Sequence, residues 1–143
     1  MVIYTIGFSQ KSLREFVKRL KTTKIKKVVD IRLQNTSQLA GFAKKDDLDY
    51  ILELVGIDYI HIPGLAPSPD LLKKFKKKEI TWEEYEHVFM EQLLMKNLDQ
   101  ILDIEEAEPL CLLCSEDQPL HCHRRLVAEY YAKLHPETVI KHL

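Results

Sequence analysis

Short apolar runs rich in β-branched residues alternate along the chain with segments whose apolar positions recur at helical spacing. The apolar runs predict five strands, over residues 2–6, 27–31, 57–62, 109–114 and 138–143. Helical spacing predicts helices over residues 13–20 and 48–55, two more after the proline-rich loop at 63–69, and others over 98–104 and 123–134. Strand and helix therefore succeed each other from end to end.

Local signals place some helix ends. The pairs Ser12/Glu15 and Thr81/Glu84 each put a hydroxyl three residues before a glutamate, which is typical of a capping box. Gly56 is expected to end the helix over residues 48–55. The sequence contains no internal repeat, linker or low-complexity segment, so we expect a single domain over residues 1–143.

The alternation predicts an α/β fold with a mainly parallel central sheet of about four to five strands and helices on both faces. Ligands of such sheets bind outside the carboxyl ends of the strands. The polar residues expected at those ends are Ser9 after the first strand, Asp30 and Arg32 after the second, His61 after the third, and Cys114 and Glu116 after the fourth. Four distant segments are thus predicted to form one polar cleft.

The segment 110–125, LCLLCSEDQPLHCHRR, concentrates the candidate chemistry at a strand-to-helix junction. Cys122 stands at the predicted helix start, where the helix N-terminus and Arg124 would lower the pKa of its thiol. That environment favours a nucleophile, with His123 or Glu116 carrying the proton. The alternative is that both Cys114 and Cys122 are buried structural thiols, as free cysteines commonly are.

A metal site is a second alternative. Cys114 and Cys122, with His61 and either His121 or His123, offer sulfur and nitrogen ligands of the kind that zinc prefers. The usual paired ligand spacing is missing, however, and the side chains of Cys111 and Cys114 are expected on opposite faces of a strand. We therefore assign no metal ligand from the sequence, and the cofactor stays unknown.

The arginines favour an anionic ligand, either a small molecule such as a nucleotide or a nucleic acid. Arg32 and one of the pair Arg124 and Arg125, with Arg124 the better candidate, would present a planar fork to phosphate or carboxylate. Alternatively, Arg124 forms a buried structural ion pair with Asp30 or Glu116. Asp30 ends an apolar strand, so it requires a partner, for which Arg32 and Arg124 are the candidates.

Charge is unevenly spread although the net charge is only −1. The first 45 residues contain eleven Lys or Arg and two Asp or Glu. A basic face over residues 11–27 could serve a non-catalytic module that binds nucleic acid or a partner, or it could be the solvated face of one helix. The lysine-rich run 73–78 is likewise expected to be a solvated helix face.

No apolar stretch is long enough to span a membrane, and the first residues do not resemble a signal peptide. Three cysteines in a chain of 143 residues predict reduced thiols and a cytoplasmic protein rather than a disulfide framework. Neither the oligomeric state nor the occurrence of a reaction follows from these features.

Five motifs run through most of the chain: TIGFSQ at 5–10, VVDIR at 28–32, the Ser37–Lys44 loop, Tyr59-x-His61-x-Pro63, and LLCSEDQPLHCHRRLVAEYY at 112–131. In these motifs the chain resembles the domain-of-unknown-function 488 family. Phe8 departs from the family's usual TIGHS, and a proline common shortly after the VDxR arginine is missing. The resemblance implies a compact α/β domain with a shared polar cleft, and it implies no activity.

Overall fold

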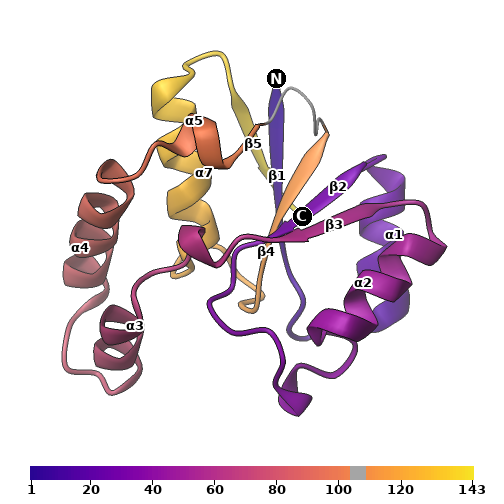
Figure 1. Cartoon of the computed structure of the whole chain (residues 1–143), viewed down its shortest axis with the longest axis horizontal. Helices are drawn as coiled ribbons and strands as arrows, with labels where there is room; N and C mark the ends of the chain where they lie inside the picture. Colours follow the sequence, from indigo (N-terminus) through magenta and orange to yellow (C-terminus); the bar gives the residue numbers. More distant parts are fainter. Residues whose placement is uncertain (104–108) are drawn as a thin grey trace.

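The fold is built on a five-stranded, fully parallel sheet in the order β3-β2-β4-β1-β5, seen in a computed structural model (Figure 1). The structure describes residues 1–103 and 109–143. The strands are β1 (Val2–Gly7), β2 (Lys27–Asp30), β3 (Asp58–His61), β4 (Leu110–Cys114) and β5 (Val139–His142). The predicted α/β class and parallel sheet are therefore confirmed.

Successive residues of the central strands face opposite sides of the sheet, and each side has its own apolar core. Val28 and Cys111 pack on one side with Phe16, whereas Val29 and Leu112 pack on the other. Burial on both faces explains why these strands read as continuous apolar runs rather than as an alternating pattern.

Helices cover both faces of the sheet (Figure 1). The helices packed on the first core are α1 (Leu13–Thr22) and α2 (Lys45–Leu54). Those on the second are α3 (Pro69–Lys76), α4 (Trp82–Leu94), α5 (Leu98–Ile101) and α7 (His123–Leu134). Two short 3-10 helices, η1 (Gln38–Ala43) and η2 (Pro63–Leu65), follow β2 and β3 respectively.

All five predicted strands are present, and each end lies within one residue of the prediction. The capping box of α4 is confirmed, because the side chains of Thr81 and Glu84 each accept from the other's backbone amide. At α1 only half of the box forms. Ser12 accepts from the amide of Glu15, but the Glu15 carboxylate turns to Arg19 instead. The predicted helix over 98–104 ends at Ile101, and residue 104 lies outside the described residues.

The connections leave the sheet in different directions at its centre. Strand β4 lies between β2 and β1 in the sheet. The loops that follow β1 and β2 lead to α1 and α2 on one face, whereas the loop that follows β4 leads to α7 on the other face. Neighbouring parallel strands with diverging connections leave a crevice at their carboxyl ends. The topology thus opens a crevice beside the end of β4.

Gly7 allows the end of β1 to approach the loop that follows β4. A Cβ at this position would overlap the carbonyl oxygen of Glu116 and lie 2.6 Å from Nη1 of Arg124. Next to it, the amides of Phe8 and Ser9 donate to the carbonyls of Cys114 and Ser115. The absence of a side chain therefore lets two loops run together at the crevice.

Gly7→Ala is expected to lower the free energy of unfolding by about 1 to 3 kcal/mol, because the added methyl must displace the backbone of the β4–α7 loop. Urea denaturation measures the change. Gly64→Ala is the matched control, since nothing lies within 4 Å of a Cβ there. Equal stability of the two variants would contradict the tight packing inferred at Gly7.

Candidate functional site

A pocket of about 570 Å³ opens at the carboxyl edge of the sheet, between the ends of β2 and β4, the start of α7, and helices α3 and α4. The predicted site residues that line it are Arg32, Cys114, Glu116, Cys122 and His123. The other residues of its wall that bear on its chemistry are Lys73, Phe75, Lys76, Lys77, Tyr85 and His121. The structure therefore brings together five of the nine predicted residues.

Cys114 and Cys122 form the floor of this pocket. Cys114 ends β4 and is 6% exposed, and Cys122 is the N-cap residue of α7 and is 2% exposed. A hydrogen bond from the Cys122 thiol, the backbone amides of Ser115 and Glu116, and the charge of Arg124 together outweigh burial and lower the pKa of Cys114. These contacts thus favour the thiolate of Cys114 relative to an unpaired buried thiol.

Cys122 has the opposite environment. Its hydrogen bond to Cys114 and its burial raise the pKa of its thiol, although Nη1 of Arg124 donates to its sulfur at 3.9 Å. Two neighbouring thiols cannot both ionise at low cost, and the raised pKa of Cys122 runs against the prediction that it is the acidic one. The third thiol, Cys111, points away into the α1–α2 core, where burial raises its pKa as well.

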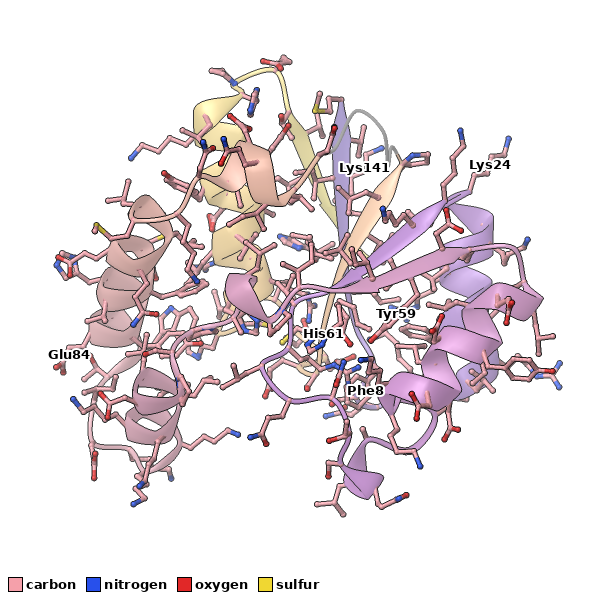
Figure 2. The ribbon with its side chains drawn as sticks, in the orientation of Figure 1. Phe8, Lys24, Tyr59, His61, Glu84 and Lys141 are labelled. Atoms are coloured by element: carbon pink, nitrogen blue, oxygen red, sulfur yellow. The ribbon has the colours of Figure 1, made fainter. Side chains whose placement is uncertain are left out.

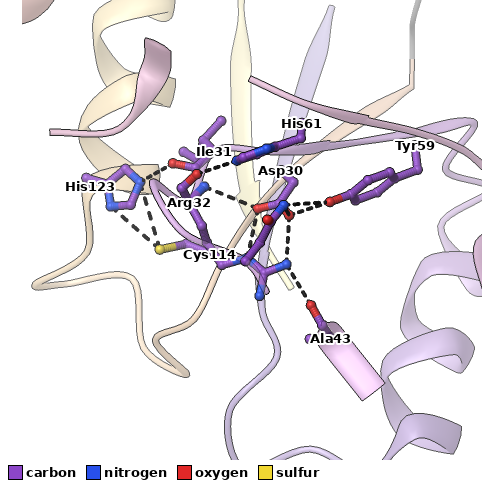
Figure 3. A network of polar contacts seen from close by, with 9 residues as sticks. Asp30, Ile31, Arg32, Ala43, Tyr59, His61, Cys114 and His123 are labelled. Carbon is purple, nitrogen blue, oxygen red and sulfur yellow. Dashed lines mark hydrogen bonds and ion pairs between the residues drawn. The ribbon is translucent and has the colours of Figure 1, made fainter. Parts of the chain in front are cut away.

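His123 lies against the sulfur of Cys114 (Figure 3). Its Nε2 is 2.8 Å from the carbonyl oxygen of Ile31, which can only accept, so Nε2 carries the hydrogen. Nδ1, 3.6 Å from Cys114 Sγ, then has a free lone pair when the ring is neutral. Burial lowers the pKa of His123 and favours that neutral form. His123 can therefore accept a proton from a thiol.

Arg124 is fully buried beneath the loop that joins β4 to α7. It donates to the Thr5 hydroxyl at 3.1 Å, to the Asp117 carbonyl at 3.2 Å and to the Glu116 carbonyl. The expected ion pair with Asp30 or with the Glu116 carboxylate does not form, and Arg124 does not line the pocket. Its contacts hold the loop in place, so it is a positioning residue.

Arg125 also points away from the pocket, although one of the two arginines was expected in the cleft. It pairs with Glu86 at 3.3 Å and with Glu129 at 3.1 Å. Its guanidinium lies 5.8 Å from the centre of the Trp82 ring, so α7 is tied to α4. Both arginines of the Cys-His-Arg-Arg motif therefore hold neighbouring elements of the fold together.

Asp30 and Arg32 form a buried ion pair at the end of β2 (Figure 3). Nε and Nη2 of Arg32 donate to the two carboxylate oxygens at 2.8 and 2.7 Å, and Nη2 also donates to the Ala43 carbonyl. Tyr59 and Asn35 complete the shell of Asp30. Burial opposes ionisation, but these hydrogen bonds and the Arg32 charge hold the pKa of Asp30 below its usual value. Arg32, not Arg124, is thus the partner that Asp30 requires.

The remaining predicted residues support this edge of the sheet without lining the pocket. Nε2 of His61 donates to the Arg32 carbonyl at 2.7 Å, and the backbone amide of Ser9 donates to the Ser115 carbonyl. Phe8 stands where the family motif has histidine, and its ring centre lies 5.1 Å from the Arg32 guanidinium. Figure 2 shows Phe8, Tyr59 and His61 close to one another where the strands end.

The wall opposite the cysteines comes from helices α3 and α4. Lys73, Lys76 and Lys77 line it, and none of the three has a salt bridge within the described ranges 1–103 and 109–143. Tyr85 and His121 also line the pocket, and the Trp82 ring centre lies 4.9 Å from that of Tyr85 and 5.0 Å from that of His121. The wall therefore combines free positive charge with aromatic rings.

These lysines were expected only as a solvated helix face, and the aromatic residues were not predicted as part of the site. The run 73–78 was visible in the sequence, but the residues that share its pocket are about forty positions away. The basic residues of α1, in contrast, do not line the pocket.

Cys114, Cys122 and His123 are also the residues that could hold a metal ion. Their ligand atoms lie within 4.8 Å of one another, and this is the one such group found in the described part of the chain. His61 and His121 do not belong to it. Of the four ligands considered in the metal-site alternative, the structure thus brings together two sulfurs and one nitrogen.

A family model, "Domain of unknown function DUF488", matches residues 12–131. The chain belongs to the DUF488 family. The match covers most of the chain and includes the Cys114–Arg124 segment and the Asp30–Arg32 pair. Comparison with curated proteins and with solved structures gave no match. Among the described residues of this DUF488 protein, no helix has the length and apolar character needed to cross a bilayer.

Asp30→Ala is expected to lower the free energy of unfolding by about 3 to 5 kcal/mol, because it leaves the Arg32 guanidinium buried without its counter-charge. Asp70→Ala, which breaks the exposed Asp70–Lys74 pair, should cost less than about 1 kcal/mol. Urea denaturation of both variants tests this difference. A loss at Asp30 no larger than at Asp70 would contradict the structural role of the pair.

Stability of the protein should fall as the pH drops below about 6.5, the ordinary pKa of histidine. The pKa of His123 is lowered in the folded protein, so between the two values the unfolded chain binds more protons and acid favours unfolding. In His123→Gln the slope of unfolding free energy against pH, between pH 7.5 and 5.5, should be smaller. His142, whose pKa is also lowered by burial, leaves a residual slope. An unchanged slope would show that His123 is not held neutral.

Proposed function

We propose that this DUF488 protein is a thiol-dependent enzyme that acts on a small anionic molecule, with Cys114 as nucleophile and His123 as proton acceptor. The observation that carries the proposal is the position of the Cys114 sulfur. It lies on the floor of the pocket, within a shell of hydrogen-bond donors from Cys122, Ser115 and Glu116. Donors that stabilise a thiolate are the arrangement by which proteins activate a cysteine.

Charge balance supports a thiolate at this place. Arg124 is completely buried, and its acceptors are carbonyl and hydroxyl oxygens and the Cys122 sulfur, with no carboxylate among the described residues. A buried guanidinium requires a compensating charge. A thiolate in the Cys114–Cys122 pair supplies it, since Arg124 Nη1 is 3.9 Å from Cys122 Sγ and its charge lowers the pKa of Cys114.

The wall of the pocket supports an anionic ligand. Lys73, Lys76 and Lys77 are exposed and have no recorded salt bridge in the described segments. Arg32 also lines the pocket, and no hydrogen bond is recorded for its Nη1 in the described part of the chain, so this group can reach a ligand. The volume suits a molecule of nucleotide size. The aromatic wall would accommodate a ring on that molecule.

Zinc bound by Cys114, Cys122 and His123 is the second candidate for this cluster, because two sulfurs and a nitrogen match its preferences. A Zn²⁺ ion with two thiolates has no net charge, however, and would leave Arg124 uncompensated. The metal-free thiolate accounts for the buried arginine better.

Alkylation by iodoacetamide at varied pH tests the thiolate. We expect a thiol that reacts in the native protein with a pKa below the ordinary ~8.5, which is lost in Cys114→Ser and retained in Cys111→Ser. Cys122→Ala should raise that pKa because it removes a hydrogen-bond donor, whereas Cys122→Ser keeps a hydroxyl donor and should change it less.

Two results would overturn the proposal. One is a native protein in which Cys114 is not alkylated faster than in the unfolded chain. The other is about one equivalent of zinc in the purified protein by mass spectrometry, lost in Cys122→Ser, which would make the cluster a metal centre.

A further inference from the structure

We propose that Cys114 and Cys122 are a redox pair that reduces anionic disulfides, Cys114 attacking the substrate and Cys122 resolving the intermediate. This inference rests on the proposed function, because it needs a nucleophilic Cys114. It adds the identity of the reacting group, a sulfur–sulfur bond, and a role for the second thiol.

The two sulfurs are placed for this reaction. They lie within 4.8 Å of each other and both border the pocket. A disulfide requires a separation of about 2.05 Å, so an inward movement of less than about 3 Å joins them. Cys122 is the N-cap residue of α7 with extended backbone angles, at the end of a loop rather than inside a helix. Cys111 lies in the core on the other side of the sheet and cannot substitute.

The presence of a second thiol beside Cys114 limits the kind of intermediate that Cys114 can form productively. A thioester or thiophosphate on Cys114 would be resolved by water, and a neighbouring thiol would compete with that water. A mixed disulfide on Cys114 is resolved by a second thiolate. Cys122 contacts Cys114 and shares the cluster with His123, which can take its proton. The pair therefore fits a sulfur electrophile.

The reaction balances in two steps. The Cys114 thiolate attacks one sulfur of the substrate R–S–S–R, a bond forms from Cys114 to that sulfur, and RS⁻ leaves. The first RS⁻ takes from His123 the proton that came from Cys114 and departs as RSH. Cys122, losing its proton to the neutral His123, then attacks the Cys114 sulfur and expels the second RS⁻, which takes that proton. The substrate gains two electrons and becomes two thiols, while the protein is oxidised to the Cys114–Cys122 disulfide. Two molecules of a low-molecular-weight thiol restore the reduced pair and are themselves joined as a disulfide.

The cationic wall selects the charge of the disulfide. Lys73 and Lys76 of α3, and Lys77 at its C-cap, line the same pocket as the two sulfurs. A substrate with carboxylates near its S–S bond would be drawn to them, whereas a cationic disulfide would be repelled. The carboxylates of glutathione disulfide make it a suitable probe.

The experiment treats the reduced protein with glutathione disulfide and measures its intact mass. Wild type and Cys111→Ser should lose the mass of two hydrogen atoms, and peptide mapping should locate a Cys114–Cys122 bond. Cys122→Ser should instead keep one glutathionyl group on Cys114, and Cys114→Ser should remain unmodified. These four patterns together identify attacking and resolving thiols.

Selectivity is measured with disulfides that differ in charge. Reduction of glutathione disulfide should be at least about tenfold faster than that of cystamine, its cationic counterpart, with neutral bis(2-hydroxyethyl) disulfide between them. Replacing Lys73, Lys76 and Lys77 together by Gln should abolish this order. The matched control replaces Lys18, Lys21 and Lys24, which are exposed near α1 and distant from the pocket, and should preserve it.

Failure of this inference can be told apart from failure of the proposed function. If Cys114 is alkylated rapidly but no Cys114–Cys122 bond forms, the redox pair is wrong and the thiol enzyme stands. If Cys114 neither alkylates nor reacts with disulfides, both are wrong. Equal rates for the three disulfides would overturn the assigned substrate charge.

Discussion

The buried guanidinium of Arg124 is the interaction on which the candidate site depends. It joins the Thr5 hydroxyl of β1 to the Glu116 and Asp117 carbonyls of the following loop. Thr5 in turn lies 2.5 Å from His142 on β5, so the chain of contacts crosses from the sheet edge to the loop. These bonds satisfy backbone carbonyls that a loop folded over a sheet would otherwise leave unpaired. They hold fixed the segment that carries both pocket thiols.

A second buried charge, Arg32, orders the other half of the crevice. Its pairing with Asp30 ends β2, and its bond to Ala43 anchors the segment that leads to α2. The two arginines thus stabilise neighbouring strand ends by different means: Arg32 through a carboxylate, and Arg124 through neutral oxygens. Only the second leaves a positive charge uncompensated by a carboxylate among the described residues, and that difference favours ionisation of a nearby thiol rather than of a side chain beside Arg32.

Much of the fold could be predicted from the sequence because it depends on local patterns of apolar and polar residues. The apolar runs and the 3.6-residue period suffice for the parallel sheet, and strand ends suffice to place Cys114 and Arg32 at one edge. The sequence could not predict which of Cys114 and Cys122 has the lower pKa, because this depends on which sulfur accepts the hydrogen bond between them. The place of Lys76 was missed for a similar reason. Its exposure is visible from helix α3 alone, but its place in the same pocket as Cys114 follows from how the β3–β4 crossover packs.

That crossover affects how the protein could evolve by amino-acid substitution. The sulfurs belong to the β4–α7 segment, whereas the lysines and most of the aromatic wall belong to α3 and α4, inserted between β3 and β4. The thiols proposed to react and the surface proposed to select the ligand therefore belong to separate segments of one chain. Substitutions in the α3–α4 hairpin can redirect the protein to a differently charged molecule while the β4–α7 loop, and the chemistry it holds, stays the same.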